Sequence, residues 1–378
     1  MPRIPTRTLL RAYQQSPLLP LLLRECRSLD SARNELRWLR ERALDISRAM
    51  HSRGAIHKHV FSGWRSLLRF MCRERSRGVP LQYILGDQPF GDLEILCRKD
   101  VLIPRPETES FTIHTADMIL REEREHRLIR GSETPFRKQS IRIIDLCTGT
   151  GCISLLLHAL LASHFERVLI LGVDISPVAI QLAKMNREHN ISLGLLSNRS
   201  GTDVHFRQGN IFGRCDPKIS SADEVIQDFI LSQDITSGVF NNDNFKCDVL
   251  ISNPPYISPT SFRNGTTARS VRMFEPELAL VPPTSMYDSM AGVCRQEDIF
   301  YHHIVALSFR LQTRLTVLEC GDFQQAQRVV IICNAFAANE PQLDKVTVEI
   351  WPNVEVNKGV GHEVDGPYAV ILHVQKIL

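Results

Sequence analysis

The chain has 378 residues with a formal net charge of +3, and 43% of the residues are hydrophobic. This length predicts about two domains, and the small net charge does not by itself indicate a nucleic-acid partner. The ten cysteines form no C-x-x-C pair, which argues against a disulfide scaffold or a zinc site and favours a reducing compartment. No apolar run approaches the length of a membrane span. We therefore expect no metal and no membrane partner.

The first 25 residues are basic. Arginine occupies positions 3, 7, 11 and 24, and no acidic residue precedes Glu25. An Arg-rich, acid-poor opening is typical of mitochondrial transit peptides, although an ordinary basic first helix has the same composition. We expect residues 1–25 to be a mitochondrial targeting segment and place the protein in the mitochondrial matrix, with the cytoplasm as the alternative.

Two further regions precede the main domain. In residues 26–80, Leu36, Leu39, Ala43 and Ile46 recur at helical spacing, which predicts a small helical domain that ends at Pro80. Residues 81–110 alternate apolar and polar side chains around a glycine-containing turn, which predicts a β-hairpin followed by a junction.

Residues 111–378 contain short apolar stretches that alternate with helical ones from residue 141 onward. This alternation predicts a doubly wound α/β sheet, and the last two stretches can pair antiparallel at its edge. Residues 213–245 are polar and rich in turns, which predicts a mobile insertion. The seven strand candidates are residues 141–146, 167–174, 203–208, 247–252, 315–320, 346–350 and 368–374.

The first strand candidate leads into a glycine-containing turn and then a helix. The glycines let a ligand approach the backbone, and a helix N-terminus favours a negative group. An acid just before the turn can hold an ammonium group, directly or through water. A plain strand-to-helix turn would have the same glycines. The residues that we expect to contact a cofactor here are Asp145, Cys147, Thr148, Gly149, Thr150 and Gly151.

The second and third strand ends add to this platform. Asp174, followed by Ile175, stands at the tip of the second strand, where an acid can accept both hydroxyls of a ribose. Asn210 and Ile211 follow the third strand and can meet the edge and the face of an adenine. A dinucleotide fingerprint needs a third glycine after Gly151, which is absent. The pattern therefore favours S-adenosyl-L-methionine as the cofactor.

The fourth strand candidate ends in Ser-Asn-Pro-Pro-Tyr, residues 252–256. The side-chain oxygen of Asn253 and the carbonyl of Pro254 are two acceptors that can take both protons of a target NH2 group, with Asn253 also beside the cofactor. Pro255 stiffens the loop, and Tyr256 can cover the amide plane and exclude water. In isolation, a strand-end turn with a packed aromatic side chain explains the same residues.

The motifs DLCTGTGCI, VDIS and SNPPYI, in this order, resemble class I S-adenosylmethionine-dependent methyltransferases that modify amino groups. PLQYILGDQPFGDLEI and VLIPRPETE, with FEPELAL at residues 274–280, are similar to the HemK/PrmC release-factor glutamine methyltransferases. LECG at residues 318–321 and the terminal YAVIL fit that family more loosely. The resemblance covers residues 80–378 and is interrupted by the insertion.

The resemblance implies a Rossmann-like class I methyltransferase domain preceded by a helical domain that docks a release factor. It also implies N5 methylation of the glutamine in the release factor's Gly-Gly-Gln loop. If residues 1–25 are a mitochondrial targeting segment, the substrate is a mitochondrial class I release factor. We expect a monomer without a direct nucleic-acid partner. From the chemistry of the loop, we expect Asn253, Pro254, Pro255 and Tyr256 to bind the substrate, and Asn253, Pro254 and Tyr256 to be catalytic.

Three departures and two alternatives remain. Cys147 stands where a glycine is common, Asn210 replaces a frequent acid, and the insertion is long. Two interpretations are open for Arg105 and Glu107: these residues contact the substrate or close over the cofactor, or they only fix the domain junction. The alternative functions are adenine-N6 methylation of nucleic acid, which would need a basic stripe or a target-recognition domain, and a catalytically silent scaffold that binds the cofactor.

Overall fold

The computed structural model describes residues 3–52, 63–129, 138–213, 216–237, 247–287, 292, 294–340, 345–352 and 367–375. The chain divides into two compact units. Unit 1 comprises Met1–Gln88, Cys97–Lys99 and Thr267–Glu275, and unit 2 comprises Pro89–Leu96, Asp100–Thr266 and Pro276–Leu378. In the described residues, no helix is both long enough and apolar enough to cross a membrane.

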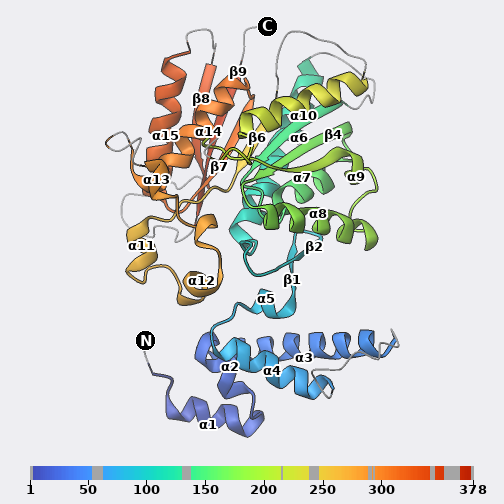
Figure 1. Cartoon of the computed structure of the whole chain (residues 1–378), viewed down its shortest axis with the longest axis vertical. Coiled ribbons are helices and arrows are strands. Elements are labelled where there is room, and N and C mark those ends of the chain that lie inside the picture. Colours follow the sequence, from blue (N-terminus) through green and yellow to red (C-terminus); the bar gives the residue numbers. More distant parts are fainter. Residues whose placement is uncertain are drawn as a thin grey trace. The chain divides into compact units, whose positions relative to one another are not determined.

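Unit 1 is built from helices packed around a small apolar core (Figure 1). The helices that form this core are α1 (Thr6–Gln15), α2 (Leu19–Cys26), α3 (Leu29–Ser52), α4 (Trp64–Ser76) and α5 (Leu81–Leu85), and α12 (Arg269–Phe274) also belongs to the unit. The helical spacing predicted from Leu39 and Ala43 is confirmed, since both side chains are fully buried in this core. Within it, the side chains of Glu35 and Arg75 form a bidentate ion pair.

The segment expected to be a targeting peptide is folded into the same unit. Ala12 of α1 and Leu19, Leu22 and Leu23 of α2 are buried in the core of unit 1. A basic amphipathic helix can present arginines to solvent while its apolar side chains pack inward. A targeting role for residues 1–25 stays a prediction, and the helices at residues 6–26 also have a structural role.

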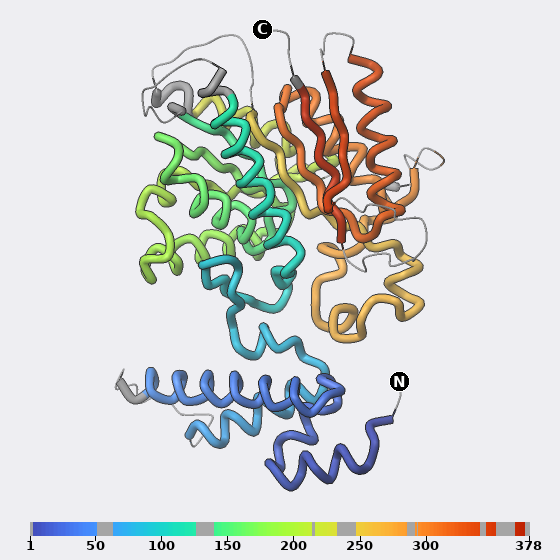
Figure 2. The backbone as a smooth tube through the Cα atoms, turned by 180° about the vertical axis from the view of Figure 1, so that it is seen from behind, coloured from blue at the N-terminus to red at the C-terminus, as the bar shows by residue number. Residues whose placement is uncertain are grey.

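Unit 2 is centred on a seven-stranded sheet of order β5-β4-β3-β6-β7-β9-β8, and all seven predicted strands are confirmed. The first five are parallel, whereas β9 runs antiparallel to β7 and β8. Figure 2 traces β8 and β9, in red, beside one another. The strands are β3 (Lys138–Leu146), β4 (Phe165–Asp174), β5 (Val204–Gln208), β6 (Val249–Ser252), β7 (Leu315–Cys320), β8 (Lys345–Trp351) and β9 (Tyr368–Gln375).

Helices cover both faces of the sheet, because alternate residues of each buried strand point to opposite sides. In β3, Ile141 and Ile143 pack in one core, and Ile144 and Leu146 pack in the other. The first core takes α6 (Pro106–Ile129), α7 (Cys152–Leu161) and α8 (Pro177–Ser192). The second takes α10 (Ala222–Ser237), α14 (Ile299–Arg310) and α15 (Phe323–Ala338). The fold is therefore the expected three-layer α/β arrangement.

The region expected to be a polar insertion contributes a helix to one layer of the fold. Ala222–Ser237 forms helix α10, and Val225, Ile226, Phe229 and Ile230 are buried against the sheet. The expectation of a turn-rich mobile insertion over 213–245 is therefore wrong for these residues. Apolar residues at this spacing line one face of a helix, and the polar residues between them obscured that pattern. Residues 214–215 and 238–245 lie outside the described residues.

Short elements complete the chain. Residues 87–96 contain the two strands of the expected hairpin, β1 (Asp87–Phe90) and β2 (Leu93–Leu96), although residues 81–85 before them are helical. The remaining elements are α9 (Ser200–Asp203), α11 (Pro259–Arg263), α13 (Thr284–Tyr287) and the 3₁₀ turns Glu277–Ala279 and Gln296–Asp298.

Candidate active site

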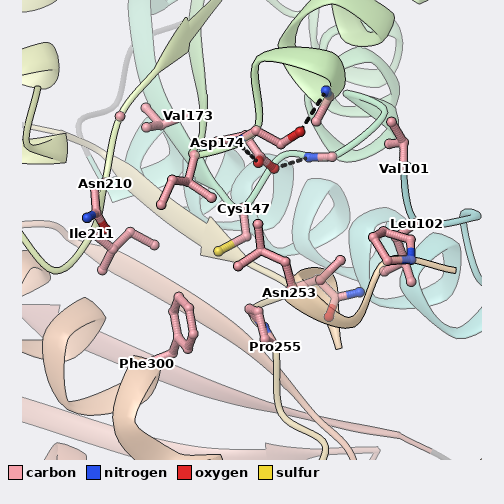
Figure 3. Close-up of a pocket in the computed structure, with 18 of the residues that line it drawn as sticks. Val101, Leu102, Cys147, Val173, Asp174, Asn210, Ile211, Asn253, Pro255 and Phe300 are labelled. Atoms are coloured by element: carbon pink, nitrogen blue, oxygen red, sulfur yellow. Dashed lines mark hydrogen bonds between the residues drawn. The ribbon is translucent and has the colours of Figure 1, made fainter. Parts of the chain in front are cut away.

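A pocket lies in unit 2 beyond the carboxyl ends of β3, β4, β5 and β6, the usual ligand position in a doubly wound sheet. Figure 3 labels Asp174, Cys147 and Asn253 among the side chains that line it. Eight residues predicted from sequence line this pocket: Cys147, Gly149, Asp174, Ile175, Asn210, Ile211, Asn253 and Pro255.

The turn after β3 needs left-handed backbone at three positions. Cys147, Gly149 and Gly151 have φ values of +58°, +55° and +79°. A Cβ at Gly151 would lie 2.8 Å from the ring of Phe206, so this glycine is also required by packing. Cys147 tolerates a conformation that a glycine adopts without cost, which explains why a glycine is common at this position in similar loops.

Asp145 is the most buried acid of the site, with an exposure of 0%. Its Oδ2 accepts hydrogen bonds from the hydroxyls of Thr148 (2.6 Å) and Ser154 (2.7 Å). Its Oδ1 is buried and has no hydrogen-bond partner among the described residues. Burial raises the pKa of Asp145 to about 6. Asp145 is not among the residues that line the pocket, so its contact with the ammonium end of S-adenosyl-L-methionine, directly or through a water, stays a prediction.

Asp174 lies at the tip of β4 and faces the pocket. Its Oδ2 accepts from the backbone N–H of Gly149, and its Oδ1 accepts from that of Ser176, both at 2.9 Å. The carboxylate therefore ties the glycine turn to the start of α8. Each carboxylate oxygen has a further lone pair, so the pair can still accept from two ribose hydroxyls.

Asn210 has a structural role that the sequence left open. Its side-chain Oδ1 accepts from the backbone N–H of Phe212 (3.1 Å), and its backbone forms a parallel bridge with Ser221, just before α10. A side-chain amide oxygen has a second lone pair, so both Oδ1 and Nδ2 of Asn210 can still meet the edge of an adenine. Ile211 lines the pocket beside it.

The Asn-Pro-Pro-Tyr loop follows β6 directly. The Nδ2 of Asn253 donates to the hydroxyl of Thr108 over 3.1 Å. Among the described residues, neither the Oδ1 of Asn253 nor the carbonyl of Pro254 accepts a hydrogen bond. Both prolines are buried. The loop therefore keeps two acceptors available on a backbone that is held rigidly.

Tyr256 is held from three sides. Its hydroxyl donates to Oε1 of Glu319 (3.2 Å), and its backbone carbonyl accepts from Nε2 of Gln325 (3.2 Å). Its ring covers Gly321, where a Cβ would lie only 2.9 Å from the ring. The LECG motif thus supplies both a carboxylate for the hydroxyl and a residue without a side chain under the ring.

The structure also brings in residues that sequence reasoning left without a role. Glu319 is 1% exposed, and burial raises its pKa to about 7, while its hydrogen bonds with Thr108 and Tyr256 lower it. The charge of Glu107 raises this pKa further and that of Arg105 lowers it, so both charges act on the site. The motifs that contain these residues were visible, but the contacts between them were not.

Comparison with known proteins identifies the class of enzyme. A family model described as a methyltransferase domain matches residues 137–256. The chain is 32% identical over 306 residues to the mitochondrial MRF1 N(5)-glutamine methyltransferase MTQ1 of Saccharomyces cerevisiae, which covers 80% of this chain and 76% of that relative. The chain belongs to the N5-glutamine methyltransferase family. This N5-glutamine methyltransferase therefore uses S-adenosyl-L-methionine as its methyl donor.

Other relatives of this N5-glutamine methyltransferase agree with the assignment. It is 31% identical over 280 residues to the probable MRF1 mitochondrial N(5)-glutamine methyltransferase of Schizosaccharomyces pombe, over 74% of this chain and 73% of that one. It is 30% identical to the release factor glutamine methyltransferase of Chlorobaculum tepidum, over 59% and 60% of the two chains.

Among solved structures, the N-terminal domain of human METTL16 with SAH aligns at 16% identity and a TM-score of 0.42, over 79% and 82% of the chains.

Proposed function

We propose that this methyltransferase modifies the side-chain amide nitrogen of the glutamine in the Gly-Gly-Gln loop of a mitochondrial class I release factor. The observation that carries the proposal is the similarity over 80% of the chain to a mitochondrial N(5)-glutamine methyltransferase. The two free acceptors of the loop after β6 support it, because a primary amide has two N–H protons to donate.

An amide nitrogen is a poor nucleophile, since its lone pair is delocalised into the carbonyl. S-adenosyl-L-methionine supplies an electrophilic methyl group on a sulfonium. In our proposal, the Oδ1 of Asn253 and the carbonyl of Pro254 accept the two N–H protons and fix rotation about the amide. The nitrogen is then aimed at the methyl group, and the two acceptors stabilise the positive charge that develops on it. The new N–C bond replaces the bond between the methyl group and the sulfonium sulfur, which is left as a neutral thioether, and one N–H proton then leaves to water.

Other residues of unit 2 would place the donor. Asp174 would accept the ribose hydroxyls, and Asp145 would face the ammonium group directly or through water. Ile175 and Ile211 would pack against the adenosine, with the turn from Cys147 to Gly151 beneath the methionine end. Tyr256 would cover the amide plane, because its ring is already fixed by Glu319 and Gly321.

The same proposal gives unit 1 the role of docking the release factor and places the enzyme in the mitochondrial matrix as a monomer. The names of the two fungal relatives support the compartment. Adenine-N6 methylation of nucleic acid is less well supported, because the curated relatives named here are glutamine methyltransferases.

Labelling with tritiated S-adenosyl-L-methionine tests the proposal. Purified enzyme should label an intact mitochondrial release factor, and it should not label the same protein with Gly-Gly-Gln changed to Gly-Gly-Ala. Equal labelling of both proteins would overturn it. Duplex DNA at physiological salt serves as the second acceptor, and labelling of DNA alone would favour the adenine alternative.

A further inference from the structure

Four side chains of the site form one hydrogen-bonded chain. Nδ2 of Asn253 donates to Oγ1 of Thr108 over 3.1 Å, and that hydroxyl donates to Oε2 of Glu319 over 2.7 Å. The hydroxyl of Tyr256 donates to the other oxygen, Oε1, of the same carboxylate. Thr108 is 2% exposed and Glu319 is 1% exposed, so bulk water does not compete for these bonds.

While Glu319 is ionised, the protons in this row of hydrogen bonds can be arranged in only one way. A carboxylate only accepts hydrogen bonds, so the single proton of the Thr108 hydroxyl points to Glu319. Thr108 then offers only lone pairs to Asn253, and only the amide nitrogen of Asn253 can bond to them. Because the amide is planar, its oxygen Oδ1 lies at the other end of the group, away from Thr108.

We propose that Thr108 and Glu319 are positioning residues that fix the side-chain amide of Asn253 with its oxygen toward the substrate. The proposal rests on the proposed function, since it takes the substrate to present an NH2 donor. If the amide of Asn253 were flipped, its own NH2 would face the NH2 of the substrate, and neither could accept. The same carboxylate also fixes the hydroxyl of Tyr256, so one buried acid orders both polar side chains of the loop.

Neighbouring threonines of α6 behave differently. The hydroxyls of Thr112 and Thr115 donate to backbone carbonyls four residues earlier, those of Thr108 and Phe111, at 2.6 and 2.8 Å. This is the common use of a threonine inside a helix. Thr108 stands in the first turn, and its hydroxyl instead reaches a carboxylate 211 residues away. Its hydroxyl therefore serves the site rather than the helix.

Turnover of three variants tests the proposal with the release factor as substrate. Thr108→Val keeps the shape but removes the hydroxyl, and we expect kcat to fall about 10- to 100-fold, as for other misplaced reacting groups, with the cofactor KM within about 2-fold. Thr108→Ser should restore most of the rate. Thr115→Val changes a matched buried threonine whose hydroxyl donates within α6, and this variant should turn over like the wild type. Equal losses in the two valine variants would overturn the proposal.

A double variant separates positioning from an independent role. If Thr108 acts through Asn253, adding Thr108→Val to Asn253→Ala should lower the residual kcat by less than about 2-fold further. A second loss as large as in the wild-type background would contradict the proposal.

A measurement without substrate keeps this test independent of the proposed function. In protein labelled with ¹⁵N-asparagine, the side-chain NH2 signal of Asn253, assigned by its absence in Asn253→Ala, should exchange slowly with solvent. Thr108→Val should speed this exchange at least about 10-fold, and Thr108→Ser should keep it slow. Unchanged exchange in Thr108→Val overturns the positioning role. Failure of the wild-type enzyme to label a release factor overturns the proposed function instead and leaves the exchange result to decide the positioning role.

Discussion

Asn253 donates a hydrogen bond to Thr108 across 145 residues of sequence. The bond joins the loop after β6 to the first turn of α6, and Glu319 of β7 completes the contact from the neighbouring strand. Three segments that are distant in sequence thus determine how one side-chain amide is presented. The loop that we propose to be catalytic is therefore held by residues that do not belong to its own motif.

The pH dependence of turnover should follow Glu319. Burial raises its pKa to about 7, so the side chain is an acceptor above this pH and carries a proton below it. Protonation lets Glu319 donate, which releases the fixed arrangement of protons at Thr108. We expect kcat/KM for the release factor, at saturating cofactor, to rise with pH through about 7. The titratable or charged groups around the Glu319 carboxyl are Arg105, Glu107, Tyr256, Cys152 and Cys320.

The control for this profile is Glu319→Gln, which cannot titrate. The rise near neutral pH should be missing in the variant, and its rate should be low throughout. A variant profile that rises at the same pH as the wild type would assign the titration to another group.

The same substitution should affect stability in a pH-dependent way. The pKa of Glu319 is raised from 4.5 in its ordinary state to about 7 in the folded protein. Such a carboxyl stabilises the fold below its unfolded pKa, and this contribution is lost as pH rises through about 7. The free energy of unfolding of Glu319→Gln minus that of the wild type should therefore increase by on the order of 3 kcal/mol from about pH 4 to pH 8, because only the wild type loses this contribution. Urea titrations at both pH values measure it, and an unchanged difference would contradict the prediction.

Gly321→Ala should displace Tyr256. The added Cβ would lie 2.9 Å from the ring, which is closer than side chains tolerate, and the ring must move. We expect turnover to fall about 10-fold or more, with cofactor affinity nearly unchanged. Gly201→Ala is the matched control, since nothing lies within 4 Å of its Cβ and its φ is not left-handed. Wild-type turnover in Gly321→Ala would show that the position of Tyr256 is unimportant.

Asp174→Asn should weaken the cofactor complex. The variant keeps the shape of the side chain but replaces one acceptor oxygen with a donor, while Gly149 and Ser176 still need acceptors. We expect the Kd for S-adenosyl-L-methionine, measured by calorimetry, to rise at least about 10-fold. Asp223→Asn, at an exposed pair with Arg310, should bind like wild type. Equal affinity in both variants would remove Asp174 from the proposed ribose site.

Most of the sheet was predictable, because its strands are short, apolar and separated by helices. The antiparallel edge was also predictable from the lack of a helix after the last strands. Helix α10 was missed, since its buried apolar residues are separated in sequence by polar ones, and acids such as Asp223 and Glu224 occupy its first turn. The packing of α1 and α2 into a core was not predicted for a related reason, because their arginines indicated only a targeting segment.

The candidate site was predictable where the functional groups stand directly at the ends of predicted strands. Asp174 and Asn253 stand at strand ends, and parallel strands bring such ends to one edge of the sheet. The network of Thr108 and Glu319 was not predictable, because it depends on contacts between α6, β6 and β7. Only a polar residue inside the VLIPRPETE motif and an acid in a buried strand marked these positions.

Mass spectrometry of the release factor after incubation with enzyme and S-adenosyl-L-methionine tests the central claim most directly. Fragmentation of the peptide that carries Gly-Gly-Gln should place a single methyl group on the glutamine side-chain amide with wild-type enzyme. With Asn253→Ala, the same peptide should be almost unmodified although the variant remains folded. A methyl group on another residue, or an equal yield from Asn253→Ala, would contradict the account.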